Sequence, residues 1–434
     1  MLDQEPRYES YKDSGEIWLG KVPTDWSLEN IRAVTELKSK RGEPDLRVLS
    51  VYRDYGVIPK DSRDDNHNAT SLDTSNYKVV EPGDLVVNKM KAWQGSMGVS
   101  EHRGIVSPAY ITCKTDADKV VPRFLHYLLR SQPFIAVYNS LSYGVRIGQW
   151  DMHYEDFKKI PLAYPDLDTQ NRIVSFLDEK TAEIDAAIAK KRRLIDLLNE
   201  QKVILINRAV TKGLNPDAPM KDSGVDWIGE IPAHWEIKQL RYISSKVGSG
   251  VTPTGGSAVY PDEGIFFLRS QNVHFDGLRL KDVKFISEKT NREMSNSQVC
   301  KNDVLLNITG ASIGRSCVYD LDDAANVNQH VCIIRPKKGI SSQFLSSLFE
   351  ARVGSEQVWL AQNGASREGL NFADLRGFVL PIPPAEEQLQ IQNFLSATQA
   401  EYRAAFDAVE AEISTLNEFK QTVIANAVTG KIKI

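Results

Sequence analysis

The chain contains one sequence framework twice, and this repeat limits the possible folds more than any other feature. Residues 12–26 return as residues 221–235, 209 positions later, and residues 83–88 return as residues 302–307, 219 positions later. Half of the 434 residues is 217, so the repeat spacing is close to half of the chain. A repeat of this length predicts two copies of one structural unit.

The two copies differ between the matching strings. Residues 40–80 do not match residues 245–300, and residues 139–151 do not match residues 355–369. Loops that carry function often vary on a shared scaffold, so this pattern favours one scaffold with two different surfaces. Loops that have drifted without consequence remain the alternative.

Each copy begins with a mixed segment. Short apolar runs such as residues 85–87 and 331–334 are bounded by turn-forming Gly and Pro, which indicates strands. One short helix is expected after the last strand, at residues 124–129 and again at residues 344–349. The predicted fold class is α+β, with two tandem repeats that each join a mixed α/β domain to a long α-helix.

The long helices are predicted from apolar stripes at steps of three and four residues. The stripe of the first copy consists of Ile173, Leu177, Ile184, Ile188, Ile195, Leu198, Leu205 and Ala209, and that of the second consists of Phe406, Val409, Ile413, Leu416, Val423 and Ala427. Each persists for about 40 residues, or about 60 Å of helix. Such a stripe needs a partner helix. We therefore predict an antiparallel coiled coil of the two helices, with the two mixed domains at its opposite ends.

Each copy also carries the spacing Trp-x-Gly-x-x-Pro-x-x-Trp, here called the tryptophan motif. Its tryptophans are Trp18 and Trp26 in the first copy and Trp227 and Trp235 in the second. Large aromatic side chains around a turn usually pack into a core or anchor an interface. Because the motif is the same in both copies, we expect a scaffold role rather than ligand stacking.

Nothing in the sequence predicts an active site. The seven histidines form no metal-binding pair, and the glycine-rich residues 248–256 lack the lysine of a phosphate-binding loop. Glu36 and Lys38 imitate a nuclease signature, but the second copy has no equivalent, so we interpret the match as chance. We predict a non-catalytic protein without a metal or cofactor of its own.

Composition indicates a protein of the cytoplasm. The N-terminus is polar and acidic, unlike a signal peptide, and no run approaches the ~20 apolar residues of a membrane span. The four cysteines, Cys113, Cys300, Cys317 and Cys332, show no paired spacing and are expected to be reduced thiols in strands. The net charge of −4 argues mildly against a nucleic-acid binder that acts alone.

The variable segments nevertheless carry side chains that contact bases or phosphates, with aromatic residues between them. The candidate DNA-binding residues are Lys89, Lys91, Trp93, Gln94, Tyr143 and Arg146 in the first copy, and Ser249, Thr252, Thr254, Arg269, Ser270, Gln271, Thr309, Ser312, Arg315, Ser366 and Arg367 in the second. A solvated loop surface is the alternative interpretation for each. The basic run at residues 190–193 lies on the first long helix, where a solvated or partner-facing surface is expected.

Taken in order, these strings resemble the specificity subunit of a Type I restriction–modification system. The resemblance spans nearly the whole chain and rests on the duplicated tryptophan motif, residues 302–315, residues 328–330 and the proline-rich start of the last helix at residues 381–388. The first copy departs from the pattern at residues 89–93 and 164–170.

The resemblance implies a division of the chain into four parts. Residues 1–165 and 214–382 would be target recognition domains that each bind one half of a split double-stranded DNA target, which is asymmetric because the copies differ. Residues 166–213 and 383–434 would be conserved spacer helices that set the distance between the halves.

The resemblance also implies partners. Two methyltransferase (modification) subunits would dock on the spacer helices, followed by restriction/translocase subunits. S-adenosylmethionine, ATP and Mg²⁺ would belong to those subunits, which could share the neutralisation of DNA phosphates. Two alternatives stay open: a related split restriction system with fused catalytic subunits, and an assembly scaffold that does not read DNA.

Overall fold

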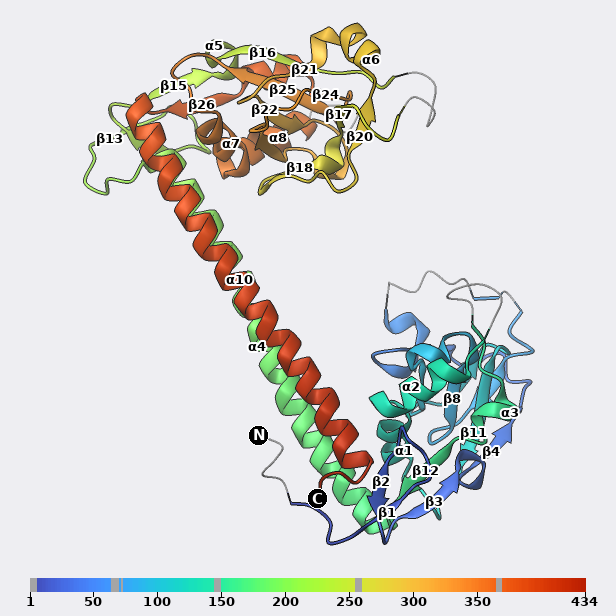
Figure 1. The fold of residues 1–434 in the computed structure, drawn as a ribbon. Coiled ribbons are helices and arrows are strands. Elements are labelled where there is room, and N and C mark those ends of the chain that lie inside the picture. Colours follow the sequence, from blue (N-terminus) through green and yellow to red (C-terminus); the bar gives the residue numbers. More distant parts are fainter. Residues whose placement is uncertain (1–5, 64–69, 72, 144–149, 254–259, 364–368) are drawn as a thin grey trace. The chain divides into compact units, whose positions relative to one another are not determined.

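The computed structural model describes residues 6–63, 70–71, 73–143, 150–253, 260–363 and 369–434. The chain forms two compact units (Figure 1). The first consists of Met1–Arg192 with Glu410–Ile434, and the second of Arg193–Val409. Both units include parts of two long helices, α4 (Leu167–Lys212) and α10 (Ala385–Val428).

An antiparallel four-stranded sheet of order β4-β11-β8-β9 forms the centre of the first unit. Its strands are β4 (Thr35–Lys38), β8 (Leu85–Asn88), β9 (Met97–Val99) and β11 (Tyr110–Thr115). The apolar run of β8 is buried on both faces: Leu85 and Val87 pack with the main core, and Val86 packs with a smaller cluster around Leu49.

The remaining strands of the first unit form pairs. They are β1 (Tyr11–Asp13) with β2 (Lys21–Pro23), β3 (Ser27–Asn30) with β12 (Pro161–Tyr164), β5 (Leu49–Tyr52) with β6 (Gly56–Pro59), and β7 (Lys78–Val80) with β10 (Gly104–Val106). Its helices besides α4 are α1 (Pro122–Leu129), α2 (Gln132–Leu141) and α3 (Tyr154–Phe157), with 3₁₀ turns η2 (Ile31–Ala33), η3 (Lys60–Ser62) and η4 (Lys89–Gln94).

The second unit has a central sheet of the corresponding order, β16-β25-β22-β23, which is also antiparallel. Its strands are β16 (Ser244–Ser249), β22 (Val304–Asn307), β23 (Ser316–Val318) and β25 (Val331–Pro336). A second sheet, β20-β17-β24-β21, takes three of its four strands from the variable residues 245–300 and contains a parallel pair, β17 with β24. Its strands are β17 (Ile265–Leu268), β20 (Lys284–Ile286), β21 (Gln298–Val299) and β24 (Ala325–Val327).

The other elements of the second unit surround these sheets. The strand pairs are β13 (Met220–Asp222) with β14 (Glu230–Pro232), β15 (Glu236–Gln239) with β26 (Val379–Ile382), and β18 (Val273–His274) with β19 (Gly277–Leu278). The helices are α5 (Leu240–Ile243), α6 (Glu288–Glu293), α7 (Ser342–Glu350), α8 (Arg352–Asn363) and α9 (Phe372–Gly377), with η6 (Ser270–Asn272), η7 (Ser295–Ser297) and η8 (Gly310–Ser312).

Two helices, not one, follow the last strand of each central sheet. α1 and α7 contain the short helices expected from the sequence, but α2 and α8 were not predicted. In the first unit, local sequence explains why α1 ends and α2 begins, because Ser131 is the N-cap of α2 and Pro133 occupies its first turn. A proline is tolerated there and starts a new helix rather than continuing the old one.

The second tryptophan of each motif is buried, as expected for a scaffold role. Trp26 is 1% exposed and Trp235 is 0% exposed. The ring of Trp235 lies beside Gly213 at the end of α4, and its Nε1 donates to Glu387 Oε2 on α10 at 3.0 Å. Trp26 lies in the same way beside Gly430, after the end of α10. Each motif therefore packs against the C-terminal end of a long helix.

The predicted apolar stripes lie on the buried or half-buried faces of both long helices. Ile173, Leu177, Ile184, Ile188, Ala209, Val409, Ile413, Val423 and Ala427 are buried, and Ile195, Leu198, Leu205, Phe406 and Leu416 are half-buried. Ion pairs join the helices within the first unit, between Asp185 and Lys420 and between Lys191 and Glu412. The residue that lies later on α4 pairs with the residue that lies earlier on α10, so the two helices run antiparallel there. Among the described residues, no helix has the length and apolarity needed to cross a bilayer.

We predict that the first unit loses stability in mild acid through one histidine. His126 on α1 is packed beneath β9, and its Nε2 lies 2.8 Å from Arg130 Nη1. Burial, together with the Arg130 and Arg123 charges, lowers the pKa of His126 from its ordinary value to about 3. Because the unfolded chain binds this proton near pH 6.5 and the folded chain does not, the free energy of unfolding should fall by about 1.6 kcal/mol between pH 6.5 and 5.

Urea unfolding at several pH values would measure this dependence. His126→Gln should flatten the curve over this interval, whereas His102→Gln, at an exposed position, should leave its slope unchanged. Parallel curves for wild type and His126→Gln would contradict the assignment.

Candidate nucleic-acid interface

In the second unit, several loops meet around the buried amide of Asn307 at the end of β22. Its Nδ2 donates to the backbone carbonyl of Ser270 at 2.9 Å and to Ser312 Oγ at 3.1 Å. Asn307 is fully buried, and its Oδ1 has no hydrogen-bond partner. One side chain thus ties the β17–η6 loop to the β22–η8 loop, and it brings the predicted residues Ser270 and Ser312 together.

A second set of contacts joins the β22–η8 loop to two further loops of this unit. Thr309 Oγ1 lies 2.5 Å from His330 Nδ1, and His330 Nε2 lies 3.1 Å from Gln329 Nε2. Gln329 Oε1 accepts a hydrogen bond from Thr252 Oγ1. The predicted residues Thr252 and Thr309 therefore meet through Gln329 and His330, which were missing from the candidate residues although the sequence string that contains them was noted.

Other predicted residues of the second unit lie near these loops but have local roles. Arg269 Nη2 donates to the carbonyl of Asp282 at 3.0 Å, and its Nε is buried without a partner. Gln271 is exposed and its carbonyl contacts His274. Ser249 is half-buried, and its hydroxyl donates to the carbonyl of Gly250 at 3.4 Å.

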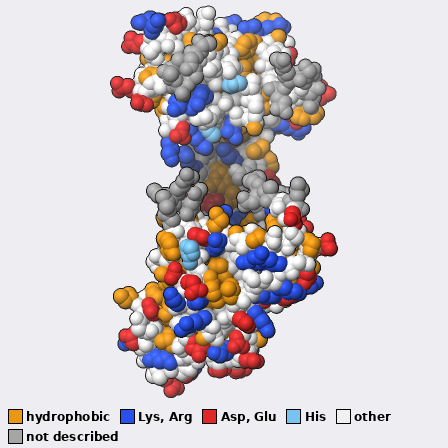
Figure 2. Space-filling view, turned by 90° about the vertical axis from the view of Figure 1, so that its right-hand side faces the viewer, with side chains coloured by type: hydrophobic (Ala, Val, Ile, Leu, Met, Phe, Trp, Pro, Cys, Tyr) orange, Lys and Arg blue, Asp and Glu red, His pale blue; other side chains and the backbone are white. Residues whose placement is uncertain are grey.

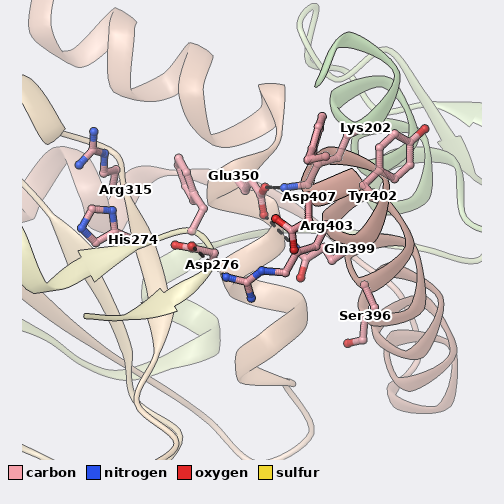
Figure 3. Close-up of a pocket in the computed structure, with 13 residues that line it drawn as sticks. Lys202, His274, Asp276, Arg315, Glu350, Ser396, Gln399, Tyr402, Arg403 and Asp407 are labelled. Atoms are coloured by element: carbon pink, nitrogen blue, oxygen red, sulfur yellow. Dashed lines mark hydrogen bonds and ion pairs between the residues drawn. The ribbon is translucent and has the colours of Figure 1, made fainter. Parts of the chain in front are cut away.

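Arg315 lines a different feature, a cleft of about 700 Å³ within the second unit (Figure 3). The cleft lies where the β18–β19 turn and α7 approach α4 and α10. Glu350 at the end of α7 pairs with Lys202 at 3.4 Å, and burial raises the pKa of Glu350. Arg403 on α10 lies 4.0 Å from Asp276 in the turn. The mixture of both charge signs is typical of a joint between elements rather than of an anion site.

The first unit has a different set of side chains at the corresponding loops. Lys89 Nζ pairs with Asp151 Oδ2 at 3.0 Å, and the backbone carbonyl of Lys89 accepts from Met152 N at 2.9 Å. The predicted loop that begins at Lys89 is therefore fastened to residues 151–152, which the sequence did not single out. Lys91 is exposed and Gln94 is half-buried.

Aromatic rings gather at this site in the first unit. Trp93 and Trp150 meet edge to face with ring centroids 5.1 Å apart, and Trp93 Nε1 is buried without a partner. Tyr143, which is 58% exposed, stacks on His153 with centroids 5.1 Å apart. The two units thus present different chemistry, since one carries rings and lysines while the other carries hydroxyl, amide and imidazole groups.

Four candidate residues, Arg146, Thr254, Ser366 and Arg367, lie outside the described residues. Over the face drawn in Figure 2, Lys and Arg side chains are interspersed with Asp and Glu in both units. This mixture agrees with the near-balance of 53 basic and 57 acidic residues.

The described residues hold no group of three or more His, Cys, Asp or Glu side chains arranged to bind a metal ion. All four cysteines are free. Burial raises the pKa of Cys113, Cys317 and Cys332 to about 12, so these thiols are poor nucleophiles. Cys300 departs from the expectation, because it is exposed and follows β21 instead of lying in a strand.

Residues 244–404 match the family described as the Type I restriction modification DNA specificity domain. The chain is 23% identical to the putative type I restriction enzyme MjaX specificity subunit of Methanocaldococcus jannaschii, over 96% of both chains. It is 25% identical to the type I restriction enzyme EcoBI specificity subunit of Escherichia coli, over 81% of this chain and 74% of that one.

The chain is thus similar in sequence to Type I restriction specificity subunits along most of its length. Its fold is similar to that of a chain solved in work on complex assembly of the type I R-M system, with a TM-score of 0.69 and 17% identity over 94% of this chain and 98% of that chain. It is also similar to the HsdS subunit from Thermoanaerobacter tengcongensis, with a TM-score of 0.51 and 18% identity over 95% and 98%. Mixed α/β content with long helices is thus the fold that this chain shares with both solved structures.

We predict that Asn307→Ala loosens both loops that its amide joins. The change removes two hydrogen bonds and leaves the Ser270 carbonyl without this donor, so the free energy of unfolding should fall by about 1–3 kcal/mol in urea unfolding. Ser312→Ala removes only one of the two acceptors and should cost less than about 1 kcal/mol. If both variants lose the same stability, the amide does not hold the loops together.

Proposed function

We propose that this specificity subunit selects the DNA sequence on which a Type I restriction–modification complex acts, and that catalysis resides in its partner subunits. The observation that carries the proposal is the pair of central sheets with corresponding strand order, whose adjoining loops present different side chains. A scaffold that is repeated while its loops differ suits two recognition sites with different targets.

Each unit would contact one half of an asymmetric double-stranded target. Hydroxyl, amide and imidazole groups around Thr309 and Gln329 provide both donors and acceptors, which the edges of bases in the major groove require. Lys89 and Lys91 with the rings around Trp93 provide charge for phosphates and surfaces for apolar contact. The predicted candidate residues other than Arg315, including the four outside the described residues, are proposed as this interface.

The proposal divides the chain as the sequence suggests. Residues 1–165 and 214–382 would be the recognition domains, and residues 166–213 and 383–434 the spacer helices. The helices would pair as an antiparallel coiled coil that fixes the distance between the two half-sites. The support is their length of 46 and 44 residues, their buried stripes and the ion pair between Asp185 and Lys420.

The net charge of −4 supports a role inside a larger complex. Proteins that neutralise many phosphates alone are usually basic. Two methyltransferase subunits docked on the helices, and restriction/translocase subunits that join them, would supply the missing positive charge. S-adenosylmethionine, ATP and Mg²⁺ would be bound by these partners.

We expect recognition to be modular. Replacing residues 27–160 with the equivalent segment of a related specificity subunit should change one half of the methylated sequence and leave the other half intact, because each unit contacts its half independently. Sequencing of methylated positions in cells that carry the complete system would measure this. A change in both halves, or in neither, contradicts the modular proposal, and methylation without sequence preference contradicts the function itself.

The length of the helices should set the gap between the half-sites. Deleting residues 190–196 and 408–414 removes one heptad from each helix, or about 10 Å, and keeps the apolar stripes in register. At about 3.4 Å per base pair, the preferred gap should shorten by about three base pairs. The same mapping of methylated positions measures the gap, with either single deletion as a mismatched control. An unchanged gap in a complex that still methylates would contradict the spacer role.

A further inference from the structure

Gln329 stands in an unusual position among the polar residues of the second unit. It is exposed at the turn between β24 and β25, yet both atoms of its amide group have partners within the protein. Oε1 accepts from Thr252 Oγ1, and Nε2 lies 3.1 Å from His330 Nε2. Exposed glutamines normally exchange their partners with water, so an amide held from both sides indicates a fixed orientation.

The contacts of His330 define the hydrogen-bond direction. Since Gln329 Nε2 only donates, His330 Nε2 accepts, and the ring proton lies on Nδ1, where it donates to Thr309 Oγ1 at 2.5 Å. These contacts, here called the Gln329 relay, run from Thr252 through Gln329 and His330 to Thr309. They use one of the two amide hydrogens and one of the two lone pairs of Gln329. One donor hydrogen and one acceptor lone pair of the same amide therefore remain for a further partner.

The backbone behind this relay is also fixed. His330 N donates to Asn328 Oδ1 at 3.1 Å, and Ile308 N donates to the carbonyl of His330 at 3.0 Å. Gly250 packs so closely that a Cβ there would lie 1.7 Å from the carbonyl oxygen of Val327. The turn is thus held in place by neighbouring loops, so presenting the amide needs little further ordering.

We propose that Gln329 reads an adenine in the half-site bound by the second unit, with Thr252 and His330 as positioning residues. The inference rests on the proposed function of the chain. A glutamine amide offers an adjacent acceptor and donor, which match the N6 amino group and N7 of adenine in the major groove. Guanine presents acceptors at both O6 and N7, so it leaves the Gln329 oxygen opposite another acceptor.

The position of the first unit that is equivalent to Gln329 cannot make this contact. The pairing of Tyr110 with Asn88 and of Val331 with Asn307 makes Tyr110 and Val331 equivalent positions, so Pro108 takes the place of Gln329. Proline has no side-chain donor or acceptor. This adenine contact therefore belongs to one half of the target only, which contributes to an asymmetric sequence.

The test uses the complete methyltransferase complex with a library of randomised duplex DNA and S-adenosylmethionine, followed by sequencing of the methylated molecules. Wild type should yield a split motif with an adenine whose discrimination depends on Gln329. Gln329→Ala should reduce discrimination at that one position by roughly 5- to 150-fold and leave the others unchanged. Thr252→Val should reduce it less, because the amide keeps its His330 contact.

Three results would separate the possible failures. An unchanged motif with Gln329→Ala, or an equal loss of methylation on every sequence, would overturn adenine reading while leaving the proposed function intact. A wild-type complex without any motif would overturn the proposed function. Gln343→Ala, on α7 away from these loops, is the matched control and should leave the motif unchanged. Because Gln329 is exposed, its Ala variant should stay folded and lose no more than the stability of its two hydrogen bonds, which thermal melting would measure.

Discussion

The packing of a tryptophan against the end of a long helix is the interaction on which both units depend. Trp26 and Trp235 are each almost wholly buried, beside Gly430 and Gly213 respectively. Both glycines have positive φ, 70° in each case, which ends the helix and allows the ring to approach the backbone. Burial of a ring of this size contributes several kcal/mol, more than any single surface contact in the unit.

Trp26 and Trp235 nevertheless differ in their polar contacts. Trp235 Nε1 donates to Glu387 Oε2, which also lies 2.7 Å from His234 Nε2, so the start of α10 is fixed to the second unit. In the first unit, Thr169 occupies the place of that glutamate, and Trp26 Nε1 has no partner. A buried N–H without a partner costs free energy, so the apolar packing of the Trp26 ring must also offset this cost. The departure of the first copy from the proline and glutamate pattern, visible in the sequence, has this physical consequence.

Sequence reasoning succeeded where local patterns decide the structure. The stripes of α4 and α10 follow from helical periodicity, and the short apolar runs of β8 and β25 are bounded by turn-forming residues, which indicates strands. It failed where distant segments meet. The parallel pairing of β17 with β24, the stacking of Tyr143 on His153 and the relay through Gln329 all join residues that are apart in the sequence. No spacing rule describes such contacts.

The same distinction explains how one scaffold can present two recognition surfaces. The strands of the central sheets are fixed by buried apolar runs, so changes in the intervening loops cost little stability as long as their polar groups find partners. In the first unit the partners are charged, as in the pair of Lys89 with Asp151, whereas in the second they are the neutral groups of Asn307, His330 and Gln329. Salt weakens the attraction between Lys89 and Asp151, and Asp151 competes with DNA phosphates for the lysine. Hydrogen bonds between neutral groups are much less sensitive to ionic strength. Contacts of the first unit should therefore depend more on salt, and those of the second more on the identity of the base.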